Sequence, residues 1–123
     1  MNFDSTAIVK SLYIHWPFCP YKCHFCPFVA LASQDQFMGD YHNALRQELL
    51  QFGESQITKT PISTVFFGGG TPSTYPNDML LDTCGILNNI FTFEDNAEVT
   101  IEVNPGTVKQ GQLEVWQSVG INR

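Results

Sequence analysis

Three cysteines lie within eight residues near the start of the chain. They are Cys19, Cys23 and Cys26, in the spacing C-x3-C-x2-C. Soft thiolates that converge from one short loop are typical ligands of an iron–sulfur cluster. Because only three cysteines are available, one iron of a [4Fe–4S] cluster would stay free of protein and could bind a small-molecule chelator. A cluster used only for electron transfer is normally held by four cysteines.

An open iron of this kind suits S-adenosylmethionine, because the amino and carboxylate groups of that cofactor can chelate it. Electron transfer from the cluster to the sulfonium would cleave a C–S bond and give a 5′-deoxyadenosyl radical, while the protein places the cofactor and excludes water. Two alternatives stay open on spacing alone. One is a zinc site completed by His15 or His24, and the other is a group of buried thiols without metal.

Three strand-then-helix units are predicted to position this loop. Apolar runs and alternation predict strands at residues 12–16, 62–67 and 98–103. Apolar residues spaced three and four apart predict helices at residues 36–52, 77–91 and 109–119. Strands that alternate with helices imply a parallel sheet of the α/β class. Three units cannot close a barrel, and residues 121–123 resemble the start of a fourth strand, so we expect a fragment.

The second and third predicted strands carry the clearest patterns. Residues 65–67 form a continuous apolar run, which predicts a strand buried on both faces. In the third strand, Glu102 and Asn104 fall on the face opposite to Val99 and Ile101. Tyr13 and Glu102 both lie opposite apolar residues of their strands, so we expect them to point into a common interior.

Glycines follow the second strand at its carboxyl end, in the order Gly68-Gly69-Gly70-Thr71-Pro72. Glycine lets a ligand approach the backbone closely, where free C=O and N–H groups can pair with an amino-acid moiety. Ligands of parallel α/β folds bind at the carboxyl ends of the strands. A tight turn from strand to helix is the alternative interpretation of the same residues.

Composition excludes several other classes. The net charge is −6 and the six basic residues are scattered, which argues against binding to nucleic acid or to an anionic membrane. No apolar run approaches the roughly 20 residues that span a bilayer, and no secretory signal is visible. We therefore expect a cytoplasmic protein with reduced cysteines. Cys84 lies on an apolar helical stripe and is predicted to be a core thiol, whereas His42 is predicted to be exposed.

These residues resemble a known family. The C-x3-C-x2-C motif with an aromatic residue, Phe25, before the last cysteine is the signature of the radical S-adenosylmethionine superfamily. The string YIHWPFC at residues 13–19 resembles the oxygen-independent coproporphyrinogen III oxidases and their relatives, the radical-SAM heme chaperones. Three further stretches agree with that group: FFGGGTPS at 66–73, EVNP at 102–105 and GINR at 120–123.

The resemblance implies a partial radical-SAM (βα) barrel. Residues 1–11 would be an N-terminal extension, and residues 12–123 would be the N-terminal part of the core domain. Cys19, Cys23 and Cys26 would ligate the [4Fe–4S] cluster. The residues implied to contact the cluster-bound S-adenosylmethionine are Tyr13, Gly69 and Glu102. Those that match contacts to a second S-adenosylmethionine in the oxidase are Phe25, Gly70 and Thr71.

Within that group, the sequence favours a heme chaperone over a true oxidase. Only 18 residues precede Cys19, whereas the oxidase carries a longer arm before its cysteine motif. Pro27 stands where the chaperone branch often has Asp. The expected partners are heme or a porphyrinogen, and a reductant such as flavodoxin or ferredoxin. The alternatives are the oxidase itself, a non-enzymatic iron–sulfur or zinc-binding module, and an inactive truncated product.

Overall fold

The computed structural model describes residues 8–21, 23–27, 29–55 and 60–123. Most of the extension predicted for residues 1–11 therefore lies outside the described residues. The elements, in chain order, are β1 (Ser11–Trp16), β2 (Phe18–Cys19), β3 (Leu31–Ala32), η1 (Asp35–Phe37), α1 (Met38–Gly53), β4 (Ile62–Gly69), η3 (Pro72–Thr74), α2 (Asn77–Ile90), β5 (Phe93–Ile101) and α3 (Gln112–Ser118).

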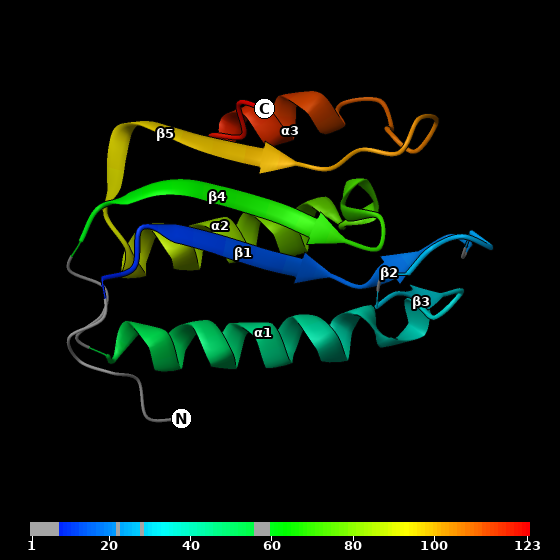
Figure 1. Cartoon of the computed structure of the whole chain (residues 1–123), viewed down its shortest axis with the longest axis horizontal. Helices are drawn as coiled ribbons and strands as arrows, with labels where there is room; N and C mark the ends of the chain where they lie inside the picture. Colours follow the sequence, from blue (N-terminus) through cyan, green and yellow to red (C-terminus); the bar gives the residue numbers. More distant parts are fainter. Residues whose placement is uncertain (1–7, 22, 28, 56–59) are drawn as a thin grey trace.

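A three-stranded parallel sheet in the order β1-β4-β5 forms the centre of the fold. Trp16 of β1 pairs with Gly69 of β4, and Phe67 of β4 pairs with Ile101 of β5. The strands therefore end at the same edge, where β1 continues into the small parallel pair β2-β3 (Figure 1). The predicted parallel α/β arrangement of about three βα units is confirmed.

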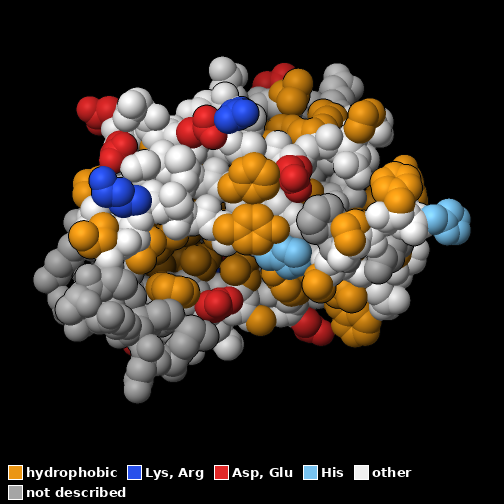
Figure 2. Space-filling model, viewed as in Figure 1, with side chains coloured by type: hydrophobic (Ala, Val, Ile, Leu, Met, Phe, Trp, Pro, Cys, Tyr) orange, Lys and Arg blue, Asp and Glu red, His pale blue; other side chains and the backbone are white. Residues whose placement is uncertain are grey.

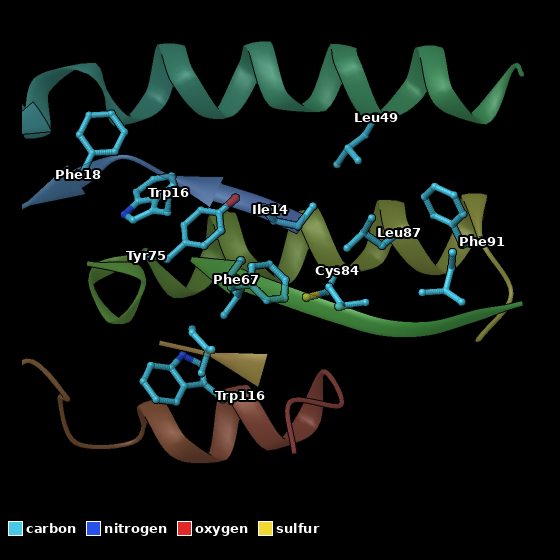
Figure 3. Close-up of a cluster of buried hydrophobic side chains, with 14 residues drawn as sticks. Ile14, Trp16, Phe18, Leu49, Phe67, Tyr75, Cys84, Leu87, Phe91 and Trp116 are labelled. Carbon is cyan, nitrogen blue, oxygen red and sulfur yellow. The ribbon is translucent and has the colours of Figure 1, made fainter. Parts of the chain in front are cut away.

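One face of the sheet is packed against helices and carries the hydrophobic core. Apolar residues of β1 and β4, such as Trp16 and Phe67, are fully buried there. Figure 3 shows Leu49 pointing from α1 into this layer and Trp116 pointing from α3 toward the sheet. The apolar residues whose spacing predicted α1 and α2 form the helix faces that pack against the sheet. Burial of this apolar area stabilises the packing of helices on the sheet.

The other face of the sheet is open to solvent. Tyr13 is 59% exposed and Phe66 is 38% exposed, and their rings stack with centroids 6.1 Å apart. Figure 2 shows apolar side chains gathered over the strands on this side. The prediction that β4 is buried on both faces is therefore wrong for this chain, because Phe66 has no second layer over it.

Some boundaries differ from the predicted ones. β5 begins at Phe93, five residues before the predicted start, and ends at Ile101, so Val103 lies beyond it. The chain after α3 returns to the edge of β5: Asn122 N–H donates to Val99 O at 2.9 Å, and Ile101 N–H donates to Arg123 O at 3.0 Å. This pairing agrees with the predicted start of a fourth strand at residues 121–123.

His42 corrects another expectation, because it is buried and only 8% exposed. Its Nε2 lies 2.8 Å from Asp82 Oδ2 of α2, and Arg46 donates to the same carboxylate oxygen. α1 and α2 pack side by side on the sheet, so the flank of α1 that carries His42 meets α2 instead of water. Cys84 is 6% exposed in the core, as predicted. None of the helices in the described parts of the chain combines the length and the hydropathy of a membrane-spanning segment.

Candidate functional site

A hollow of about 380 Å³ opens at the carboxyl ends of β4 and β5, beside the cysteine loop. Its lining contains eight of the nine site residues predicted from the sequence: Cys19, Cys23, Phe25, Cys26, Gly69, Gly70, Thr71 and Glu102. Tyr13 is the predicted residue outside this lining. The structure thus brings together residues from the loop after β1 and from the ends of two further strands.

Cys19 is the fixed member of the cysteine group. It is 7% exposed and ends β2, where Ser33 N–H donates to its carbonyl at 3.1 Å. The neighbouring Phe18 carbonyl accepts a hydrogen bond from Thr71 N–H at 2.9 Å. Backbone hydrogen bonds on both sides therefore hold Cys19 against the turn that follows β4.

Gly70 and Gly69 make this close contact possible. A Cβ atom on Gly70 would lie 2.7 Å from Cys19 Sγ and 2.6 Å from Pro17 O, so a side chain there would collide with the cysteine strand. Gly69 has a φ of +123°, a conformation that favours glycine, and its Cβ would meet Trp16 O at 2.6 Å. The glycine turn is therefore required by packing against the cysteine loop as well as by backbone conformation.

The backbone donors of this turn are not all free, which corrects the expectation from the sequence. Gly70 N–H donates to Trp16 O at 2.7 Å, and Thr71 N–H donates to Phe18 O. These two groups hold β1 and β2 against the turn. They are therefore not available to pair with a ligand in this conformation.

Cys23 and Cys26 lie together on a separate turn. Cys26 N–H donates to Cys23 O at 3.0 Å, and both residues are partly exposed. The Phe25 ring between them is 87% exposed. All three cysteines of the loop are free thiols that face one hollow, one of them buried and two of them accessible from outside.

Polar side chains from β5 and the loop beyond it complete the lining. Glu102 N–H donates to Phe67 O at 3.1 Å, which fixes Glu102 just past the end of β5, where it lines the hollow. Asn104 Nδ2 donates to Thr71 Oγ1 at 3.1 Å and joins the loops that follow β4 and β5. Sequence reasoning gave Asn104 no site role, although its alternation with Glu102 already placed both on one face.

Tyr13 lies on the open face of the sheet, next to the hollow. Its hydroxyl is 3.1 Å from His15 Nδ1, and a Cβ on Gly68 would lie 3.1 Å from that hydroxyl. Partial burial, followed by the negative charge of Glu102, raises the pKa of Tyr13. Tyr13 and Glu102 are therefore close enough to interact electrostatically, and Tyr13 stays protonated at neutral pH.

The donor set has the chemistry that an iron–sulfur cluster requires, which is soft sulfur ligands. Among the described residues, no three His, Cys, Asp or Glu side chains are gathered closely enough to hold one metal ion. A cluster instead spreads its thiolates over separate irons, so its ligands need not surround one point. His15 and His24 are absent from the lining of the hollow. The residues present thus offer three soft sulfur ligands around a space between them.

Comparison with known proteins gives a consistent result. The model of the radical SAM superfamily matches residues 13–123. A heme chaperone, HemW, from Bacillus subtilis is 34% identical over 94% of this chain, and HemW from Haemophilus influenzae is 37% identical over 92% of it. The chain spans about 30% of the length of each of these relatives.

A solved structure also matches. The coproporphyrinogen III oxidase (HemN) from Escherichia coli, described as a radical SAM enzyme, superposes with a TM-score of 0.84 and 31% sequence identity. The match covers 92% of this chain and 26% of the oxidase chain. The partial (βα) barrel predicted from the sequence is confirmed by this likeness, since both fold and sequence agree over nearly the whole chain.

Proposed function

The chain belongs to the radical SAM superfamily, and from that premise we propose that it is the cluster-binding part of a radical S-adenosylmethionine protein of heme metabolism. One observation carries the proposal: a single hollow is lined by three free cysteines, by the glycine turn after β4 and by the carboxylate at the end of β5. Sulfur ligands, backbone clearance and a carboxylate are the groups that such a cofactor pair requires.

Cys19, Cys23 and Cys26 are the residues that would hold the [4Fe–4S] cluster. When bound, the cluster supplies low-potential electrons and one iron without a protein ligand. Cys19 offers an ordered anchor, because β2 and the turn after β4 fix its backbone. Cys23 and Cys26 lie on a more exposed turn that faces the same hollow.

Glu102, Gly69 and Tyr13 are assigned to the S-adenosylmethionine that binds beside the cluster. The Glu102 carboxylate suits the positively charged amino group of that cofactor. Gly69 lies in the lining of the hollow, and because it has no side chain its backbone can pack against Trp16 O of β1. Tyr13 supplies a protonated hydroxyl on the open sheet face.

Phe25, Gly70 and Thr71 are assigned to the same cofactor class, whether one or two S-adenosylmethionine molecules bind. Phe25 presents an exposed aromatic ring at the rim of the hollow, which suits contact with an adenine base. Gly70 allows the turn to lie against Cys19. Thr71 is fully buried and held by Asn104, so its position is fixed before any ligand arrives.

The heme chaperone is the branch we favour. The HemW relatives are 34% and 37% identical to this chain, compared with 31% for the oxidase of known structure. On this proposal the complete protein binds heme and receives electrons from a reductant such as flavodoxin or ferredoxin. The oxidase alternative predicts decarboxylation of coproporphyrinogen III instead. Supplying the reconstituted complete protein with each tetrapyrrole separates them: the chaperone retains heme and leaves coproporphyrinogen III unchanged.

The cluster assignment is tested by anaerobic reconstitution with iron and sulfide, followed by metal and sulfide analysis. We expect about four irons and four sulfides per chain. Replacing any one of Cys19, Cys23 or Cys26 with Ala should reduce that content strongly, whereas the matched control Cys84→Ala should retain it. Stoichiometric zinc in place of iron, or equal loss in the control, would contradict the assignment.

A further inference from the structure

We propose that Cys23 and Cys26 form a reversible disulfide bond when the cysteine loop carries no cluster. The bond would store two of the three thiols in a form that cannot bind metal until it is reduced. That the two sulfur atoms can be joined follows from the geometry of the turn and does not depend on the proposed function. The meaning of the bond for cluster loading rests on the function proposed above.

The turn brings the two cysteines to a separation that a disulfide can span. Cys26 N–H donates to Cys23 O at 3.0 Å, which is the bond between the first and fourth residues of a β-turn. Such a turn keeps the two Cα atoms within about 7 Å, and disulfides join Cα atoms about 4.4–6.8 Å apart. The backbone therefore needs little movement for the sulfur atoms to meet.

The other two cysteines of the chain are shielded. Cys19 is 7% exposed, with its Sγ against the backbone of Gly70, and Cys84 is 6% exposed in the core. Burial also raises the pKa of Cys84 to about 11, so its thiolate is scarce at neutral pH. Cys23 and Cys26 are partly exposed free thiols. An oxidant in solution can therefore reach Cys23 and Cys26 but not Cys19 and Cys84.

The oxidant that we assign is a small-molecule disulfide such as glutathione disulfide. The thiolate of one cysteine attacks it, forms a mixed disulfide and releases one glutathione thiolate. The second cysteine then attacks the protein sulfur of that mixed disulfide and releases the other glutathione. Two cysteine thiols are oxidised by two electrons, glutathione disulfide is reduced to two glutathiones, and the two thiol protons pass to the released thiolates.

The loss of metal binding follows from the chemistry of sulfur. Thiolates bind iron, whereas the sulfurs of a disulfide carry no negative charge and are poor ligands. With Cys23 and Cys26 joined, only Cys19 remains of the three ligands. Conversely, thiolates already bound to iron are not free to attack a disulfide, so a loaded loop should resist oxidation.

The test uses cluster-free protein exposed to glutathione disulfide without oxygen, then acid quenching, unfolding, alkylation and peptide mass mapping. We expect a Cys23–Cys26 disulfide, with Cys19 and Cys84 recovered as alkylated thiols. Cys26→Ser should stop the reaction at a glutathione adduct on Cys23, and Cys84→Ala should leave the pairing unchanged. A disulfide that includes Cys19, adducts on all four cysteines, or no disulfide would overturn the proposal.

The same treatment of cluster-loaded protein tests the link to the cofactor. We expect the bond to be suppressed in proportion to the measured iron content. If loaded protein forms the disulfide at the same rate while keeping its iron, the proposed exclusion is wrong. If the protein takes up no cluster at all, the proposed function fails, whereas disulfide formation in the cluster-free protein would still be established by its mass.

Discussion

Gly70 lies so close to Cys19 that a Cβ atom on the glycine would be 2.7 Å from the cysteine sulfur. The two residues are far apart in the sequence, and they meet because parallel strands β1 and β4 end at the same edge of the sheet. The contact joins the cysteine loop to the glycine turn. This contact explains both why residue 70 is a glycine and why Cys19 is buried.

Gly70→Ala should therefore displace Cys19 and weaken cluster uptake. The methyl group would also approach Pro17 O and Phe18 O to 2.6 and 2.8 Å, and backbone atoms cannot rotate away. We expect a loss of about 1–3 kcal/mol in the free energy of unfolding, measured by denaturant titration, together with lower iron content after reconstitution.

Gly85→Ala is the matched control for this change. Gly85 lies within α2 with open space around its Cβ direction, and alanine favours a helix over glycine by about 1 kcal/mol. This variant should be as stable as the original chain or more so, with unchanged iron content. Equal behaviour of the two variants would show that the contact between Gly70 and Cys19 has no consequence.

Asp82→Ala should loosen the contact between α1 and α2. His42 Nδ1 has no hydrogen-bond partner among the described residues, so the bond from Nε2 to Asp82 is the polar contact that this buried ring keeps. Its loss should cost about 1–3 kcal/mol in the free energy of unfolding. Asp82→Asn retains an acceptor oxygen and should cost less. The exposed control Asp78→Ala should lose only about 0.3–1 kcal/mol, from its place in the first turn of α2.

Cys84 should make stability depend on pH in the alkaline range. Burial raises the pKa of its thiol from 9.0 to about 11. Above pH 9 the unfolded chain loses this proton while the folded chain keeps it. The contribution of Cys84 to the free energy of unfolding is therefore fully present below pH 9 and is lost as the pH rises toward 11. The slope from this group is at most about 1.4 kcal/mol per pH unit.

The comparison that checks this prediction is unfolding of the original chain and of Cys84→Ala between pH 7 and pH 11. The other titrating groups are common to both proteins, so the difference in slope reports Cys84 together with its electrostatic effect on Tyr75. The variant should lose less stability than the original chain across this range. Parallel curves would mean that the thiol ionises equally easily in the folded and unfolded states.

Asn104→Ala should remove the hydrogen bond to Thr71 and leave the Thr71 side chain, which lines the hollow, less firmly positioned. The lost bond of 3.1 Å predicts a cost of about 0.5–1.5 kcal/mol in unfolding free energy. If Thr71 contacts S-adenosylmethionine, affinity should fall about two- to tenfold, measured by titration of the reconstituted protein. The exposed control Asn96→Ala should change neither quantity, and an Asn104 variant with the same affinity as this control would exclude the positioning role.

Much of the fold could be predicted from the sequence because its elements carry strong periodic patterns. The apolar stripe with Leu45 and Leu49 located α1, and the run at residues 65–67 located β4. The first part of β5 was missed because Glu94, Asp95 and Asn96 break the alternation, although this segment still belongs to the strand. Phe93 pairs with Ile62, and the register is irregular from there until Thr64 pairs with Glu98, so this part of the strand shows no regular alternation in its sequence.

The remaining errors concern contacts between elements. His42 was expected to face water, since helical periodicity describes the face toward the sheet and not the flank that meets α2. In the same way, the glycine motif predicted a close backbone approach but not that Gly70 N–H and Thr71 N–H are already used. The site residues that line the hollow were predicted from the resemblance to the family motifs. Asn104 was missed because its contact with Thr71 depends on how two loops meet.

The central claim is that three thiolates hold a [4Fe–4S] cluster whose remaining iron is open to S-adenosylmethionine. Its most direct test is the EPR spectrum of the reduced, anaerobically reconstituted protein, recorded before and after S-adenosylmethionine is added. The account predicts a distinct change in the cluster signal when the cofactor chelates the open iron. A spectrum that stays the same at saturating S-adenosylmethionine, or a protein without any cluster signal, would contradict it.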